Sequence, residues 1–131
     1  MTNIALPPYA QTMGMRFAGD ERGSPVVTMD FAPHAMGRPG FFHGGAISGV
    51  LEVAGFAALA AELDRQNTPA RIRPINISVE FLRGGIEEPI FACDSVLRAG
   101  RRVANVQVEA WQSDRSRPIA SCWMNFQLTA R

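Results

Sequence analysis

The segment from Met36 to Ala46 holds the residues of this chain whose types and spacing are best suited to chemistry. It reads MGRPGFFHGGA, and His43 is followed directly by Gly44 and Gly45. Two glycines at the beginning of a helix let another chain or a ligand approach the backbone closely. The N–H groups of the first turn have no partner within the helix and carry the positive end of its dipole. Such a terminus can bind a phosphate, a carboxylate or a developing oxyanion.

Glu52 is the second candidate group. Its neighbours in the chain are Val50, Leu51, Val53 and Ala54, which predicts a partly desolvated carboxylate. Burying an unpaired carboxylate is costly, so a core has no use for one. Two explanations are open: Glu52 pairs with one of the arginines, or it acts as a nucleophile or general base.

The spacing of these two features limits how they can cooperate. Glu52 lies seven residues beyond Gly45, which is ~10 Å along a helix that rises ~1.5 Å per residue. One helix therefore cannot bring its own first-turn N–H groups and its own Glu52 to one small reacting group. Two antiparallel, facing helices can, and this predicts a symmetric homodimer with shared sites.

The composition narrows the chemistry further. The 131 residues include 13 Arg and no Lys, with a net charge of +1. No Schiff base or phosphate-loop lysine is possible, and side-chain charges that meet an anion must be arginines. A balanced charge favours neither a nucleic-acid partner nor a membrane surface.

Metal-binding residues and targeting signals are scarce. The histidines are His34 and His43, and the cysteines are Cys93 and Cys122. We therefore expect no metal site and two buried, reduced thiols. The N-terminus lacks a basic start and a long apolar run, and the apolar stretch at 46–61 is short for a membrane span. We expect a cytoplasmic protein.

One helix and several strands are expected to position these residues. The helix runs from Gly45 to about Asp64, and its apolar residues on nearly every face predict burial. Alternating patterns predict strands at 75–82, 104–110 and 120–128, with weaker candidates at 13–18, 26–31 and 90–97. Short turns between strands favour antiparallel pairing. The fold class is therefore α+β, a single domain over 1–131 in which an antiparallel sheet curls around one central helix.

His43-Gly44-Gly45 opening a long helix, an acid nine residues after the histidine, and the segment SVEFLRG at 78–84 together resemble the hotdog-fold acyl-CoA thioesterases. The similarity extends over about residues 13–129 and is greatest to the branch typified by the phenylacetate-degradation thioesterase. It implies that the backbone N–H of Gly44 polarises the thioester carbonyl. Glu52 of the facing subunit is then the nucleophile or general base, and His43 orders the loop. The resemblance also implies acyl-CoA as substrate, no cofactor, and a homodimer or tetramer.

The same resemblance places the nucleotide of CoA near the ends of the middle strands. Arginines at predicted strand ends and turns are candidates to bind its phosphates. Phe41, Phe42 and the outer face of the helix are candidates to line an acyl pocket, and a core role for the two aromatic residues stays open. The candidate substrate-binding residues are Phe42, Gly45, Arg83, Gly84, Arg101 and Arg102.

One position departs from the family pattern. Members usually carry Asn or Gln six residues before the histidine, and this chain has Gly37 there. His34 or Arg38 could supply the missing donor. The departure leaves open a non-catalytic acyl-CoA-binding or sensing protein. A hotdog dehydratase is less favoured, because its histidine and acid have a different spacing from the nine residues between His43 and Glu52.

Overall fold

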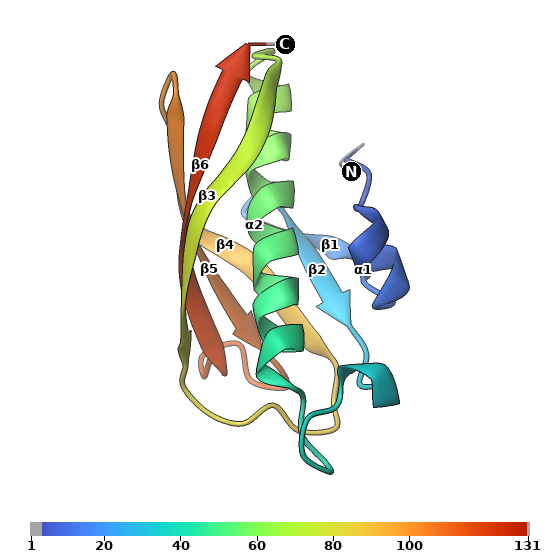
Figure 1. Ribbon diagram of the computed structural model, residues 1–131. Helices are drawn as coiled ribbons and strands as arrows, with labels where there is room; N and C mark the ends of the chain where they lie inside the picture. The colour runs from blue at the N-terminus through green and yellow to red at the C-terminus, as the bar shows by residue number, and fades with distance from the viewer. Residues whose placement is uncertain (1–3, 131) are drawn as a thin grey trace.

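The computed structural model describes residues 4–130, which form one six-stranded antiparallel sheet and one long helix (Figure 1). The expected order of two strands, a helix and four strands is confirmed. The elements are α1 (Pro8–Thr12), β1 (Arg16–Glu21), β2 (Ser24–Met29), the 3-10 turn η1 (Pro33–Ala35), α2 (Gly44–Arg65), β3 (Ala70–Phe81), β4 (Ile90–Ala99), β5 (Val103–Trp111) and β6 (Ala120–Ala130).

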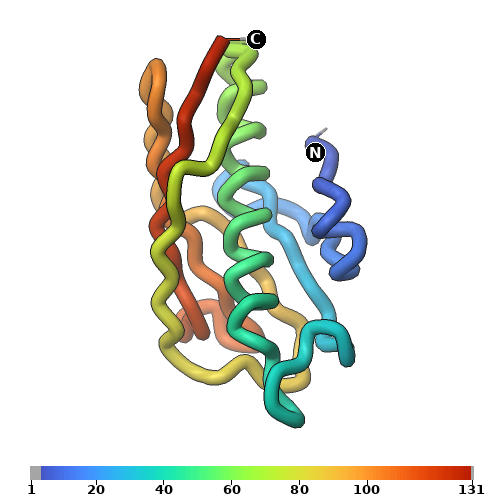
Figure 2. The backbone as a smooth tube through the Cα atoms, in the orientation of Figure 1, coloured from blue at the N-terminus to red at the C-terminus, as the bar shows by residue number. Residues whose placement is uncertain are grey.

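The sheet has the strand order β1-β2-β4-β5-β6-β3. Short turns join β1 to β2, β4 to β5 and β5 to β6, and each of these pairs is antiparallel. β3 pairs with β6 rather than with β4, so residues 82–89 must cross from one edge of the sheet to its middle. Figure 2 shows this crossing passing beneath the N-terminal end of α2. It brings the β3–β4 connection beside the loop that precedes the helix.

The curved sheet wraps one side of α2, and the core lies between them (Figure 1). Side chains of α2 such as Leu51 and Leu59 are fully buried with Val108 and Met124 of the sheet. The helix is not buried on every face, contrary to the sequence-based expectation. A stripe that includes Gly45 and Glu52 is exposed, because the sheet covers only one side.

α2 is longer than its apolar stretch at 46–61, which by itself predicted a segment short for a membrane span. It has 22 residues, and an 18-residue window within it has a mean hydropathy of 1.6, so by length and composition it is long and apolar enough to span a membrane. However, 72% of that window is buried inside the fold. Its apolar character is accounted for by its place against the sheet.

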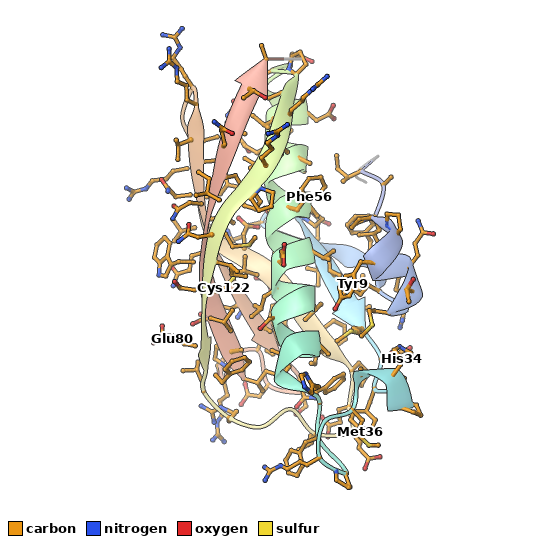
Figure 3. All side chains as sticks on the ribbon, viewed as in Figure 1. Tyr9, His34, Met36, Phe56, Glu80 and Cys122 are labelled. Carbon is orange, nitrogen blue, oxygen red and sulfur yellow. The ribbon has the colours of Figure 1, made fainter. Side chains whose placement is uncertain are left out.

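Two short elements were not expected from the sequence. These are α1 and η1, of five and three residues. Both are too short to show a helical period. α1 packs on α2, opposite the β3 edge, and carries Tyr9 towards the open face of the helix (Figure 3). β3 begins at Ala70, earlier than the alternation indicated, with an irregularity between Pro74 and Asn76.

Both cysteines are free and buried, as expected. Burial raises the pKa of the Cys93 thiol to about 12, and burial together with the negative charge of Glu52 raises that of Cys122 to about 12. Within residues 4–130, no group of three or more His, Cys, Asp or Glu side chains is arranged to hold a metal ion.

Candidate active site

His43 is the N-cap residue of α2. Its backbone is extended, with φ −68° and ψ 140°, and its imidazole Nδ1 accepts a hydrogen bond of 2.8 Å from the N–H of Gly45. Its carbonyl oxygen accepts the N–H groups of Ala46 and Ile47 at 3.0 and 3.1 Å. The bond from Ile47 is the first regular bond of the helix, and the N–H of His43 itself donates to the carbonyl of Ala35 at 2.8 Å. Of the four donors that a helix start leaves unpaired, those of His43, Gly45 and Ala46 are therefore satisfied.

The fourth donor is the N–H of Gly44, the first residue of the helix. It has no hydrogen-bond partner among the residues that the structure describes. It lies at the positive end of a 22-residue helix, where a partial negative charge is stabilised. Phe81, at the end of β3, packs against Gly44, since a Cβ built there would lie 3.4 Å from its ring. The sequence motif identified this donor, but not the aromatic ring beside it.

Gly45, the second glycine of the pair, is needed to make room for the imidazole of His43. A Cβ on Gly45 would lie 2.9 Å from Nδ1 of His43, inside any normal contact. A side chain at this position would therefore displace the capping imidazole. Gly45 allows the cap to form, and the cap leaves the N–H of Gly44 as the donor that a ligand can reach.

Glu52 lies on the exposed face of α2 and lines a cavity of 460 Å³. The expectation of a partly desolvated carboxylate is wrong for this single chain. The residues next to it in the sequence point to other faces of the helix, towards the sheet. Within residues 4–130 no arginine forms an ion pair with Glu52, so the structural explanation for this carboxylate finds no support.

Residues from four elements line the cavity around Glu52. Ser48, Gly49 and Phe56 precede or follow Glu52 at helical spacing, so their positions can be derived from the sequence once the helix is known. The remaining lining residues come from the N-terminal segment, the neighbouring helix positions and the sheet, and only the tertiary structure reveals them. They are Pro7, Tyr9, Gly45, Val53, Pro74 and Phe126.

Comparison with known proteins identifies the family. The model described as the acyl-CoA thioesterase N-terminal domain matches residues 32–127. This chain belongs to the acyl-CoA thioesterase family. The medium/long-chain acyl-CoA thioesterase YigI of Escherichia coli strain K12 is 30% identical to this thioesterase over 114 residues, which cover 78% of this chain and 74% of YigI.

Solved structures agree with the fold. A protein from Chromobacterium violaceum has 34% identity and a TM-score of 0.73, covering 93% of this thioesterase and 83% of that chain. AziG from S. sahachiroi has a TM-score of 0.83 at 17% identity, covering 97% of this chain and 100% of AziG, a likeness of fold alone. The expected hotdog fold is confirmed, and the protein is a thioester hydrolase.

The departure at Gly37 has a local structural cause. Met36 and Phe42 form an isolated bridge, and the N–H of Gly37 donates to the carbonyl of Phe41 at 2.9 Å, so the loop doubles back on itself. A Cβ on Gly37 would lie 3.0 Å from the Cα of His43. The loop of this thioesterase brings position 37 against the capping residue and leaves little room for an amide side chain there.

Neither candidate replacement donor contacts the site. Nε2 of His34 is 3.5 Å from the carbonyl oxygen of Met13, on the side facing α1 (Figure 3). The guanidinium of Arg38 lies over the ring of Phe41, 4.0 Å from its centroid. His34 therefore contacts the end of α1, and Arg38 contacts the loop itself.

Of the expected substrate-binding residues, Phe42 is packed into the fold, whereas Gly84 is exposed and lies against the loop before α2. Phe42 is 6% exposed, and its ring meets the ring of Phe31 edge-on at a centroid distance of 4.9 Å. It does not line the cavity around Glu52. Gly84 lies under Phe41, because a Cβ there would be 3.0 Å from that ring. Both residues join the loop before α2 to the β3–β4 connection.

The three candidate arginines separate into two places. Arg83 follows β3 at the N-terminal end of α2, and its Nε donates to the carbonyl of Pro118 at 3.1 Å. Arg101 and Arg102 are exposed in the β4–β5 turn, at the other end of the molecule. The carbonyl of Arg102 accepts the N–H of Leu128, beside the end of β6. One subunit therefore does not bring all three together.

Proposed function

We propose that this thioesterase hydrolyses medium- to long-chain acyl-CoA at sites shared between two subunits. The N–H of Gly44 in one subunit donates a hydrogen bond to the carbonyl oxygen, and Glu52 of the facing subunit acts on the carbonyl carbon, either as the nucleophile or by activating water. One observation carries the proposal: His43 accepts the N–H groups of Gly45, Ala46 and Ile47, whereas the N–H of Gly44 has no partner among the described residues. The chain-length class is that of YigI, the relative named above.

The reaction can take two balanced routes. In one, the Glu52 carboxylate attacks the carbonyl carbon, the C–S bond breaks, and an anhydride forms that water then cleaves. In the other, Glu52 takes a proton from water while the water oxygen attacks the same carbon. Both pass through an oxyanion that the N–H of Gly44 stabilises, and both release CoA as a thiolate that accepts a proton. Trapping a covalent acyl-enzyme distinguishes them.

A single subunit separates the two groups. Gly44 and Glu52 are eight residues apart on one straight helix, which places them ~12 Å apart along its axis at ~1.5 Å per residue. The open face of α2 near its start is formed by the small residues Gly45, which is exposed, and Ser48, which is partly exposed, and small residues allow a second helix to approach closely. Two antiparallel copies of α2 would bring the N–H of one to the carboxylate of the other.

β3 supports the same assembly. It is a 12-residue edge strand that pairs with β6 on one side only, and Ile75 on it is 58% exposed. The open edge of a long strand presents a row of N–H and C=O groups that can pair with another chain. We propose that β3 pairs with its copy in a homodimer, which can further assemble into a tetramer.

The arginines fit this arrangement as candidates for the CoA phosphates. Arg83 lies at the same end of the subunit as Gly44, whereas Arg101 and Arg102 lie at the opposite end. Two antiparallel subunits would bring the β4–β5 turn of one towards the helix start of the other. We expect no cofactor besides the CoA of the substrate itself.

Thiol release from acyl-CoA, with and without Glu52, tests the proposal. The wild type is expected to release CoA, and Glu52→Gln to lose nearly all activity while still binding acyl-CoA. Equal rates for the two proteins would overturn the role of Glu52. Binding by both without release by either would instead favour an acyl-CoA sensor.

Mixed dimers test the shared site directly. In a dimer of one Gly44→Pro subunit and one Glu52→Gln subunit, both defects fall in one shared site and the other site is intact. Mixing the two inactive proteins is therefore expected to restore activity. If each site lay within one chain, every site would carry one defect and no activity would return.

A further inference from the structure

Two cavities lie end to end along the exposed face of α2. The inner cavity contains Glu52 and has a volume of 460 Å³, and the outer cavity, of 700 Å³, continues along the helix to Asn67. Among the described residues that line them, Phe56 is the one common to both. Phe56 lies one turn beyond Glu52 on α2, so the two side chains project from the same face of the helix and both line the inner cavity.

The two cavities differ in chemistry. Apart from Ser48, Glu52 and the hydroxyl of Tyr9, the inner cavity is lined by apolar residues and glycines. The outer cavity combines apolar residues on α2 and β3, such as Leu63, with polar and charged side chains. The latter are Asp64, Asn67, Thr68 and Arg71. An aliphatic chain therefore finds its most apolar surroundings between Glu52 and Phe56.

Tyr9 closes one side of the inner cavity. A Cβ on Gly49 would lie 2.3 Å from the Tyr9 hydroxyl, so α1 and α2 are in direct contact at this point. Pro74 of β3 lines the other side. Between these two sides, the cavity continues along the helix from Glu52 to Phe56. The apolar lining that an acyl chain meets there is given by Val53 and Phe126.

We propose that Phe56 sets the acyl-chain length that this enzyme accepts. The inference rests on the proposed function, in which the thioester carbonyl lies beside Glu52. Shorter chains end against the Phe56 ring inside the inner cavity. Longer chains must displace the ring to reach the outer cavity and its apolar surface. Phe56 is partly exposed, so its ring has room to move.

Substitutions at Phe56 test this with kcat/KM for octanoyl-CoA and palmitoyl-CoA, each below its micelle-forming concentration. Phe56→Ala joins the two cavities and is expected to raise the palmitoyl-to-octanoyl ratio by about tenfold, the scale of discrimination that a hydrophobic pocket provides. Phe56→Trp places a larger ring between the two cavities and should lower the palmitoyl-to-octanoyl ratio. Phe91→Ala, which removes a partly buried ring remote from α2, should leave the ratio unchanged.

These measurements distinguish a failure of the Phe56 inference from a failure of the proposed function. If the wild type hydrolyses neither substrate, the proposed function fails first. If the wild type is active and both Phe56 variants keep its ratio, Phe56 does not set the length. Should Phe56→Ala fail to fold, an unchanged ratio in Phe56→Trp overturns the inference by itself. A changed ratio in Phe91→Ala of the same size would also overturn it.

Discussion

Nδ1 of His43 accepts the N–H of Gly45 at 2.8 Å, and this hydrogen bond determines which backbone donor at the start of α2 can reach a substrate. The carbonyl of His43 takes the next two N–H groups. The N–H of Gly44 is left at the positive end of the helix, with Phe81 beside it. A single capping residue therefore both stabilises the helix and orients the proposed oxyanion donor.

Loss of this cap should destabilise the protein measurably. We expect His43→Ala to lower the free energy of unfolding by about 1 kcal/mol, the usual contribution of an N-cap side chain. His43→Asn should recover most of the loss, because asparagine is an effective cap. Urea denaturation measures both. Equal stability of the alanine variant and the wild type would contradict the capping role.

The N–H of Gly44 can be removed without removing the helix. Proline is favoured at the first position of a helix and lacks the N–H, and the extended backbone of His43 suits a residue before proline. We expect Gly44→Pro to reduce kcat by about 10²–10³, as for other oxyanion donors.

Gly44→Ala is the matched control for that experiment. Its Cβ would meet the Phe81 ring at 3.4 Å, an ordinary contact, and its N–H is retained. Activity near that of the wild type is expected. A loss as large as that of the proline variant would show that the contact with Phe81, rather than the donor, limits the reaction.

Restoring an amide at position 37 should not improve the enzyme. The Cβ of Gly37→Asn would lie 3.0 Å from the His43 backbone, and relieving that contact should cost about 1–2 kcal/mol of stability. Gly37→Ala carries the same Cβ without the amide and should be destabilised to a similar extent. Thiol release and urea denaturation are measured together. If the Asn variant were faster than both the wild type and the Ala variant, the amide would have a place in this loop.

The buried thiols make stability depend on alkaline pH. The pKa of each of Cys93 and Cys122 rises from 9.0 to about 12 on folding. Their protonated form is therefore favoured in the folded state, and the stability that they contribute is present below pH 9 and lost as pH rises towards 12. Between pH 9 and 10 the expected loss is about 1 kcal/mol per thiol.

The absence of lysine makes this effect unusually easy to measure. Arginine stays charged in this range, and the chain has a single tyrosine, so few other side chains titrate there. Urea denaturation at pH 8, 9 and 10 should show the decline, and Cys93→Ala and Cys122→Ala should each reduce its slope. A slope unaffected by both substitutions would rule out the thiols as its source.

An ion pair on the far side of the sheet makes stability depend on acid pH. Arg115 binds both carboxylate oxygens of Glu21, and this hydrogen bonding, followed by the positive charge, lowers the pKa of Glu21 below 4.5. Its contribution is present above pH 4.5 and is lost as pH falls through the lowered value. Since both groups are about one-third exposed, Glu21→Gln should cost at most about 1 kcal/mol at pH 7.

The difference between Glu21→Gln and the wild type should shrink as the pH falls from 7 to 3. Asp30→Asn is the control, because its pair with Arg16 is largely exposed and should contribute little at any pH. Urea denaturation at several pH values provides the comparison. A difference that stayed constant down to pH 3 would mean that Glu21 acts through packing rather than charge.

Much of the site could be inferred from the sequence because it depends on local order along one helix. The backbone donor follows from a glycine at the first helical position, and the distance to Glu52 follows from the helical rise. The alternation in β3, β5 and β6 predicted those strands, because the period of side chains in a half-buried strand is fixed by its geometry. These relationships are contained within single elements.

What only the tertiary structure decided is which surfaces those elements present. The apolar neighbours of Glu52 suggested burial, but the sheet covers one side of α2 and leaves the carboxylate exposed. Tyr9 reaches the same face from α1, a helix too short to show a period in the sequence. Phe42 lies in the core, which its place in the loop before α2 did not indicate. Arg83 lies far from Arg101 and Arg102, because strand order depends on pairing between distant segments. Helical periodicity determines which residues share a face, and only packing determines what that face meets.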